Sequence, residues 1–213
     1  MLFRSYGEGL ADAFTKRAEE DGAQIVTRQK IGEKDTDFSN VIAAVKPFAP
    51  DGIYYGGQYP QAGPLSKQFA GAGVNVPVMG GDGIFDKQYI ALGGKNGDLA
   101  TSVGAPTEEL ASAKAFVDAY AKAGYAEGFS AYGVFSYDAA NVIIGAVSKA
   151  LDGKEWSDSL RPAVVTATQD FKGEGATGAL AFDENGDSTN TTLTVYQVAD
   201  GDWKSVKTGK FGE

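Results

Sequence analysis

The first hundred residues alternate between segments with helical hydrophobic spacing and short apolar runs. Three segments carry apolar residues three or four positions apart, which predicts helices at residues 6–21, 38–46 and 60–72. Three short apolar runs follow them, which predicts buried strands at about residues 23–28, 52–55 and 76–79. Alternating helices and short buried strands are typical of a parallel, doubly wound sheet, so the fold class predicted is α/β.

Two glycine-rich loops follow the second and third predicted strands. They are Gly56-Gly57-Gln58-Tyr59 and Gly80-Gly81-Asp82-Gly83. In parallel sheets, ligands bind at loops beyond the carboxyl ends of the strands, so we expect both loops at one edge and consider them candidates for a binding site. The alternative is that the glycines only make tight turns. Tyr59 and Asp82 beside them favour binding, because such loops often carry functional groups.

The second half of the chain has longer helical segments and fewer strands. Spacing predicts helices at residues 107–123, 129–150 and 156–166, and strands at 100–104, 178–182 and 192–198. Asp200-Gly201 is a hairpin turn signal and predicts a last strand from Trp203.

Composition excludes several kinds of chemistry. The 213 residues include no His and no Cys, which removes Ser-His-Asp hydrolases, thiolate nucleophiles and the commonest zinc sites. We therefore expect no metal, no cofactor and none of these enzyme classes. The net charge of −9 with no basic cluster opposes a nucleic-acid partner, and no run approaches the roughly 20 apolar residues of a membrane span.

Three short motifs are weak signals. Residues 173–178 match G-x-G-x-x-G but precede a strand rather than a helix, which opposes nucleotide binding. Residues 183–187 resemble the start of a calcium loop, yet Ser188 and Thr194 occupy its glycine and glutamate positions, so a turn is favoured. Residues 190–192 fit a glycosylation sequon, a weak pattern by itself.

Six further motifs occur in one order along the chain. They are Tyr6-Gly7-Glu8-Gly9-Leu10-Ala11, Asp37-Phe38-Ser39, Tyr54-Tyr55-Gly56-Gly57, Met79-Gly80-Gly81-Asp82-Gly83, Tyr137-Asp138-Ala139-Ala140-Asn141 and Phe182-Asp183-Glu184-Asn185-Gly186-Asp187. Together they resemble the branched-chain (Leu/Ile/Val) amino-acid-binding proteins of bacterial ABC importers, which have the type I periplasmic binding protein fold. The resemblance extends from Tyr6 to about Trp203.

The resemblance implies two lobes of doubly wound parallel sheet joined by a hinge that the chain crosses three times. By similarity, residues 1–105 are the second lobe without its first strand, 106–188 are the C-terminal part of the first lobe, and 189–213 return to the second. It thus implies an N-terminally truncated fragment without signal peptide. Such a chain is expected to bind poorly, because the strand before Tyr6 and the carboxylate-binding half of the cleft would be absent.

The resemblance also implies a function: capture of a free amino acid in the cleft between the lobes, for a membrane permease, outside the cytoplasm. Asp82 matches the carboxylate that meets the ligand's ammonium, Tyr6 an aromatic of the first loop, and Tyr132 an aromatic of the other lobe. Gln58 stands where relatives often carry an aromatic residue, which opposes a purely aliphatic ligand.

Structural alternatives stay open for all four residues. Tyr6 could only pack at a helix start, Asp82 could cap the turn at 83–88, Gln58 could merely begin a helix, and Tyr132 could belong to the core. Two other function classes also stay open. One is a sensor or receptor domain of the same fold, and the other is a small α/β enzyme with paired carboxylates. The sequence does not identify the amino acid.

Overall fold

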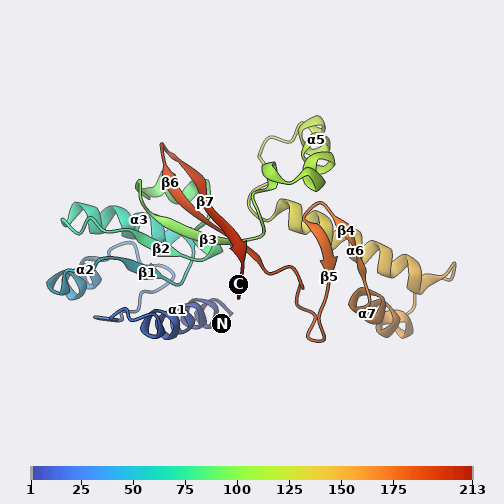
Figure 1. Ribbon diagram of the computed structural model, residues 1–213, viewed down its shortest axis with the longest axis horizontal. Coiled ribbons are helices and arrows are strands. Elements are labelled where there is room, and N and C mark those ends of the chain that lie inside the picture. The colour runs from blue at the N-terminus through green and yellow to red at the C-terminus, as the bar shows by residue number, and fades with distance from the viewer. Residues whose placement is uncertain (1, 213) are drawn as a thin grey trace. The chain divides into compact units, whose positions relative to one another are not determined.

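The computed structural model describes residues 2–212, with side chains from Tyr6 onward, and divides into two compact units (Figure 1). Unit 1 extends to Ser102 and includes Thr194–Lys207. Unit 2 consists of Val103–Leu193 and the chain end from Thr208. The chain therefore crosses the boundary between the units at three points.

Unit 1 is built on a five-stranded sheet in the order β1-β2-β3-β6-β7. Its strands are β1 (Ile53–Tyr55), β2 (Val78–Gly80), β3 (Leu99–Val103), β6 (Thr192–Ala199) and β7 (Asp202–Lys210). Its helices are α1 (Leu2–Glu20), α2 (Ser39–Val45), η1 (Lys46–Phe48), α3 (Tyr59–Gly71), η2 (Asp82–Ile84) and α4 (Lys87–Leu92). Strands β1, β2 and β3 are parallel, as the helix–strand alternation predicts.

The predicted hairpin at the end of the chain is confirmed. Strands β6 and β7 are neighbours in the sheet and are joined by Asp200 and Gly201. Both turn residues have positive φ, 54° and 76°. A two-residue turn with this geometry matches the twist of the flanking strands.

The predicted strand at residues 23–28 is wrong. The segment forms no strand. In the five-stranded sheet β1 is the terminal strand, so the segment does not pair with β1. A strand needs a neighbour with which to exchange backbone hydrogen bonds, and this segment lies instead beside α1. Arg28 Nη1 lies 2.5 Å from Asp12 Oδ1, and Lys30 Nζ lies 3.4 Å from Glu8 Oε1.

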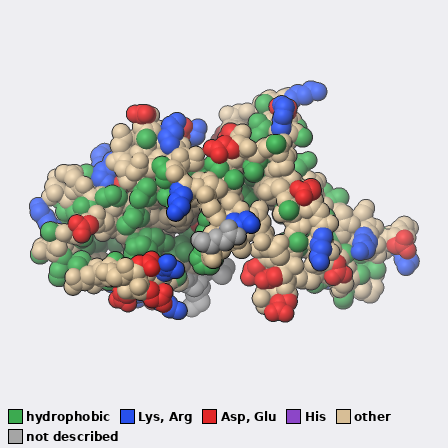
Figure 2. Space-filling model, viewed as in Figure 1, with side chains coloured by type: hydrophobic (Ala, Val, Ile, Leu, Met, Phe, Trp, Pro, Cys, Tyr) green, Lys and Arg blue, Asp and Glu red, His purple; other side chains and the backbone are tan. Residues whose placement is uncertain are grey.

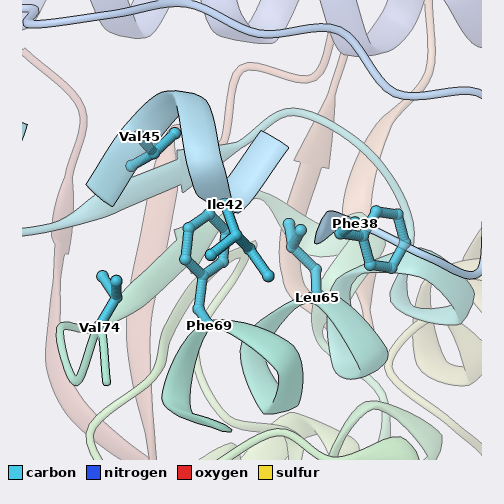
Figure 3. Packing of buried hydrophobic residues seen from close by; sticks show 6 residues of the cluster. All are labelled: Phe38, Ile42, Val45, Leu65, Phe69 and Val74. Atoms are coloured by element: carbon cyan, nitrogen blue, oxygen red, sulfur yellow. The ribbon is translucent and has the colours of Figure 1, made fainter. Parts of the chain in front are cut away.

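One hydrophobic core of unit 1 lies between α2 and α3. Figure 3 shows Ile42 of α2 pointing toward Leu65 and Phe69 of α3. The buried members of this cluster are Phe38, Ile42, Val45, Leu65, Phe69 and Val74. The helical spacing of these residues in the sequence therefore identified the buried faces correctly.

A buried carboxylate connects the helices of unit 1 to its sheet. Asp98 is fully buried, and its Oδ2 accepts hydrogen bonds from Ser66 Oγ of α3 at 2.6 Å and Tyr89 Oη of α4 at 2.7 Å. Its Oδ1 accepts from the backbone N–H of Val78 at 2.9 Å and from Lys95 Nζ at 2.6 Å. The Lys95 ammonium neutralises the carboxylate, so the buried charge is both paired and hydrogen-bonded.

The same position ties β3 to the C-terminal hairpin. The carbonyl of Asp98 accepts the N–H of Val198, and the N–H of Gly97 donates to the carbonyl of Val198, both at 2.9 Å. Strand β6, which returns from unit 2, is therefore hydrogen-bonded to Asp98, the residue that also contacts α3, α4 and β2.

Unit 2 contains helices packed beside a short hairpin. Its elements are η3 (Thr107–Glu109), η4 (Ala111–Ala113), α5 (Lys114–Ala123), α6 (Gly133–Leu151), η5 (Asp158–Leu160), α7 (Arg161–Gln169), β4 (Lys172–Gly175) and β5 (Gly178–Ala181). The helix predicted from residue 107 is thus two short 3-10 turns followed by α5. The helices predicted at 129–150 and 156–166 begin later, at Gly133 and Asp158.

A second buried carboxylate organises unit 2. Asp138 of α6 is buried and accepts the backbone N–H groups of Ala176 and Thr177, both at 2.8 Å, and the Thr177 hydroxyl at 2.6 Å. These residues form the turn between the antiparallel strands β4 and β5. The glycine-rich segment at 173–178 is therefore a hairpin held by a side chain, and it forms no helix N-terminus for a phosphate.

The segment at residues 183–187 is a turn, as favoured from the sequence. Asp183 Oδ1 accepts the backbone N–H groups of Asn185 and Asp187, both at 2.9 Å. These two hydrogen bonds lower the pKa of Asp183, the one from Asp187 having the larger effect.

Charges are mixed over the surface of the protein. Figure 2 shows acidic and basic side chains interspersed on the face in view, with no continuous basic stripe. Of the helices described, none is both long and apolar enough to cross a bilayer.

We predict that Asp98→Ala lowers the free energy of unfolding of unit 1 by about 3–5 kcal/mol, because it leaves the partly buried Lys95 ammonium and several buried donors without their acceptor. The measurement is urea unfolding followed by Trp203 fluorescence in a Trp156→Phe background, since Trp203 lies in unit 1. Asp21→Ala is the matched control. It removes a carboxylate whose ion pair with Arg17 is exposed, and it should leave the stability nearly unchanged. Equal effects of the two substitutions would contradict the role given to Asp98.

Candidate functional site

The two glycine-rich loops of unit 1 lie at one edge of the sheet, as predicted. In the parallel pair of β1 and β2, Ile53 lies opposite Val78 and Tyr55 opposite Gly80. The loops therefore leave their strands side by side. A methyl group placed at Gly83 would lie 2.5 Å from the carbonyl oxygen of Gly57, so the two loops are in backbone contact.

Asp82 stands at the centre of this edge. It is the first residue of η2, and its carbonyl accepts the N–H of Phe85 at 2.9 Å, which closes the turn. Its side chain is partly exposed, and Oδ1 accepts a hydrogen bond from the Tyr6 hydroxyl at 2.6 Å. The cap of α4 is Asp86, whose Oδ1 accepts the N–H of Gln88 at 2.7 Å. The side chain that caps α4 is therefore that of Asp86.

Tyr6 reaches Asp82 from α1, which is 76 residues away in the sequence. Its side chain is 37% exposed, and its hydroxyl would lie 3.6 Å from a methyl group at Gly81 and 3.2 Å from one at Gly83. The phenol thus lies over the loop that carries Asp82. Tyr6 does more than pack at the start of a helix, because its polar end is directed at the candidate site.

Two further tyrosines lie on β1 at the same edge. Tyr54 stacks on Phe14 of α1, with ring centroids 4.0 Å apart and planes 7° apart. Burial raises the pKa of Tyr54, and the negative charge of Asp82 raises it further. Burial also raises the pKa of Tyr55 to about 12, partly offset by a hydrogen bond from the Gln58 backbone.

Gln58 is the residue before α3, in an extended conformation with φ −114° and ψ 162°. Its side chain is exposed and makes no capping hydrogen bond to the helix. The Gln58 carbonyl accepts the N–H of Ala62 at 3.2 Å, so its backbone begins α3, while its side chain takes no part in the cap.

Tyr132 lies in unit 2, at the residue before α6, and is 46% exposed. The alternative that it belongs to the core of that unit is therefore wrong. Of the four predicted site residues, the structure brings Tyr6, Gln58 and Asp82 to one edge of unit 1 and places Tyr132 in unit 2.

Sequence reasoning missed two features of this edge. One is the electrostatic effect of Asp82 on Tyr54, and the other is a close approach of Gly7 to Gly56. The pair Gly56-Gly57 directly after an apolar strand was a signal for close backbone contact, but the sequence did not show which segment makes that contact.

Comparison with known proteins identifies the family. A family model described as "Periplasmic binding protein" matches residues 3–202. The chain belongs to this family. The type I periplasmic binding protein fold expected from the motifs is confirmed by solved structures of this kind.

The chain is 32% identical over 200 residues to the Leu/Ile/Val-binding protein homolog 3 of Brucella melitensis, covering 92% of this chain and 52% of that protein. It is 31% identical over 198 residues to the leucine-, isoleucine-, valine-, threonine- and alanine-binding protein of Pseudomonas aeruginosa, covering 91% of this chain and 50% of that protein. These relatives are binding proteins rather than enzymes. The chain spans about half the length of the relatives that it matches.

Two solved structures show the same fold. The leucine-binding protein LivK from Thermotoga maritima superposes with a TM-score of 0.84 at 28% identity, over 97% of this chain and 57% of that chain. The branched-chain amino-acid transporter substrate-binding protein LivJ from Streptococcus pneumoniae, in complex with isoleucine, gives a TM-score of 0.77 at 26% identity. That match covers 94% of this chain and 57% of LivJ.

We predict that Asp82→Asn lowers the pKa of Tyr54, because removing the nearby negative charge makes the phenolate less unfavourable. Burial should keep this pKa above its ordinary value of about 10. The measurement is a pH titration by NMR of protein labelled with ¹³C at the tyrosine ζ carbon. Tyr55 is the internal control, since burial and the Gln58 backbone determine its pKa of about 12. An unchanged Tyr54 titration would show that Asp82 does not act on this tyrosine.

Proposed function

We propose that this chain is part of the extracytoplasmic binding component of an ABC importer for a branched-chain or related amino acid. The observation that carries the proposal is the Tyr6–Asp82 pair at the carboxyl edge of parallel strands, which is where ligands bind in such sheets. The relatives support this choice of ligand class, since they are named for binding leucine, isoleucine and valine. A membrane permease is the partner that this function requires.

Asp82 has the chemistry needed to bind the ammonium group of an amino acid. A carboxylate and an ammonium form a charge-assisted hydrogen bond, which strengthens when water is excluded from around it. The Tyr6 hydroxyl already holds one oxygen of Asp82 at 2.6 Å, so the carboxylate is oriented before ligand arrives. A fixed carboxylate loses less conformational entropy on binding than a mobile one.

Gln58 and Tyr132 would complete the contacts to the ligand. Gln58 adds an uncharged side-chain amide at the edge that carries Asp82. Because an amide can donate and accept hydrogen bonds, it suits a ligand whose side chain carries a polar group. Tyr132 is exposed on unit 2 and supplies an aromatic surface. We propose that it covers the ligand's side chain when the two lobes close.

We propose that unit 1 corresponds to the second lobe of the family and unit 2 to the C-terminal part of the first. The three crossings of the chain, after Ser102, after Leu193 and after Lys207, are then the hinge. Hinge closure around a ligand is an established way to couple binding to a change of shape. A permease could distinguish the closed, loaded protein from the open one on this basis.

Two other function classes are less well supported. A sensor domain of the same fold would use the same site, and a signalling partner in place of a permease would identify it. A carboxylate-based enzyme needs a second acid with an opposed pKa in the site. The contact described at Asp82 is with a phenol, which does not supply that second acid.

We predict that Asp82→Ala weakens amino-acid binding by about thirtyfold to a few thousandfold, because removing one partner of a buried charge pair costs roughly 2–5 kcal/mol. The measurement is calorimetric titration of leucine, isoleucine, valine and threonine into the longest natural protein that contains this sequence. Asp51→Ala is the matched control, since Asp51 is an exposed acid at the opposite end of β1.

Two results would contradict the proposal in different ways. Unchanged affinity of Asp82→Ala for every amino acid that the wild type binds would remove Asp82 from the site. A folded wild-type protein that binds none of these amino acids would overturn the function itself.

A further inference from the structure

The backbones of α1 and of the loop after β1 touch at two glycines. A methyl group at Gly7 would overlap the carbonyl oxygen of Gly56, and one at Gly56 would overlap the carbonyl oxygen of Gly7. Both obstacles are backbone atoms, which cannot turn aside as the end of a flexible side chain can. Only glycine at both positions allows this approach.

This contact lies directly beside the Tyr6–Asp82 pair. Gly7 follows Tyr6 in α1, and Gly56 begins the loop that contacts Gly83, next to Asp82. Farther along α1, the stacking of Phe14 on Tyr54 holds the helix against the same strand. The glycine contact and the aromatic stack therefore fix the distance of α1 from β1 at two points.

We propose that Gly7 and Gly56 are positioning residues, whose mutual backbone contact sets the Tyr6 hydroxyl at Asp82 and thereby orients the ligand-binding carboxylate. The proposal rests on the function proposed above. It adds a determinant of affinity that touches no ligand.

The physical reason is the rigidity of a helix. A methyl group at Gly7 must displace the helix start away from Gly56, and Tyr6, the preceding residue, moves with it. Hydrogen bonds weaken steeply as donor and acceptor separate and lose alignment. A shift of about 1 Å would leave Tyr6 Oη and Asp82 Oδ1 beyond good hydrogen-bond distance, and Asp82 would lose the partner that orients it.

The chain offers a matched control two residues away. Gly9 lies in the same helix, and a methyl group there would meet nothing within 4 Å. Gly7→Ala and Gly9→Ala therefore gain the same helix propensity, and they differ in the clash with Gly56. Gly56→Ala is a second test variant, because its methyl group would overlap the Gly7 carbonyl oxygen from the other side of the same contact.

The first measurement is affinity for the tightest binder among leucine, isoleucine and valine. In the Gly9→Ala background, Tyr6→Phe should weaken binding about fivefold to thirtyfold, as expected for loss of a hydrogen bond to a charged group. In the Gly7→Ala background, affinity should already be lower by a similar factor, and Tyr6→Phe should add less than a twofold change.

The second measurement needs no ligand. Urea unfolding of Tyr6→Phe, Asp82→Asn and the double variant gives the coupling between the two side chains. We expect a coupling of about threefold or more in the unfolding equilibrium constant in the Gly9→Ala background, since the pair is partly exposed. We expect none in the Gly7→Ala background. If Gly7→Ala does not fold, Gly56→Ala takes its place in both measurements.

The two measurements separate the inference from the proposed function. Coupling that persists unchanged in Gly7→Ala, or in Gly56→Ala as its replacement, would overturn the positioning role, whatever the protein binds. If the coupling between Tyr6 and Asp82 is lost in Gly7→Ala but the wild-type protein binds no amino acid, the positioning role is supported and the proposed function is overturned.

Discussion

Unit 1 depends on the neutralised, fully buried carboxylate of Asp98. Hydrogen bonds from α3, α4, β2 and the loop before β3 converge on its two oxygens, and its backbone joins the C-terminal hairpin. A buried charge is tolerated only when it is paired and its hydrogen-bonding capacity is used, so all these segments must be in place together. The hydrophobic contacts between the helices could form with many small shifts, whereas this network permits few.

The hydrogen bonds of Asp98 also affect the position of the candidate site. Val78, held by Asp98, begins β2, and β2 ends at the loop that presents Asp82. Strand β1 pairs with β2 and carries the loop that meets α1. A displacement of β2 would therefore move Asp82 relative to Tyr6. Asp138 does for unit 2 what Asp98 does for unit 1, since one buried carboxylate holds the β4–β5 hairpin to α6.

In the proposed function, unit 1 holds the carboxylate and unit 2 supplies an aromatic contact. Tyr6 and Asp82 form their hydrogen bond within unit 1, and Tyr132 lies on a different unit. A binding protein that closes on its ligand benefits from this division. One unit can be prepared for the charged ammonium group while the other remains free to approach. The absence of His and Cys from the chain is compatible with such a role, because binding requires shape and charge but no nucleophile.

Local patterns in the sequence predicted the parallel α/β character, the buried faces of α2 and α3, the C-terminal hairpin and the edge at which the two loops lie. Each of these follows from local hydrophobic spacing or turn chemistry, as in the buried series Phe38, Ile42, Val45 or the turn Asp200-Gly201. The sequence also indicated Asp82 and Tyr6 as candidates, through the order of the motifs.

Features that depend on contacts between distant segments became visible only in the folded structure. Residues 23–28 have the apolar character of a strand, but they have no paired neighbour and lie beside α1. In the sequence, Asp98 is one acid in a glycine-rich segment, with no local signal of burial. Its burial follows from contacts with Ser66, Tyr89 and Lys95 in the folded protein. Gly7 and Gly56 are 49 positions apart, and their mutual contact exists only once α1 packs on β1. Pairing, charge burial and backbone approach are properties of two segments at once, so no single segment encodes them.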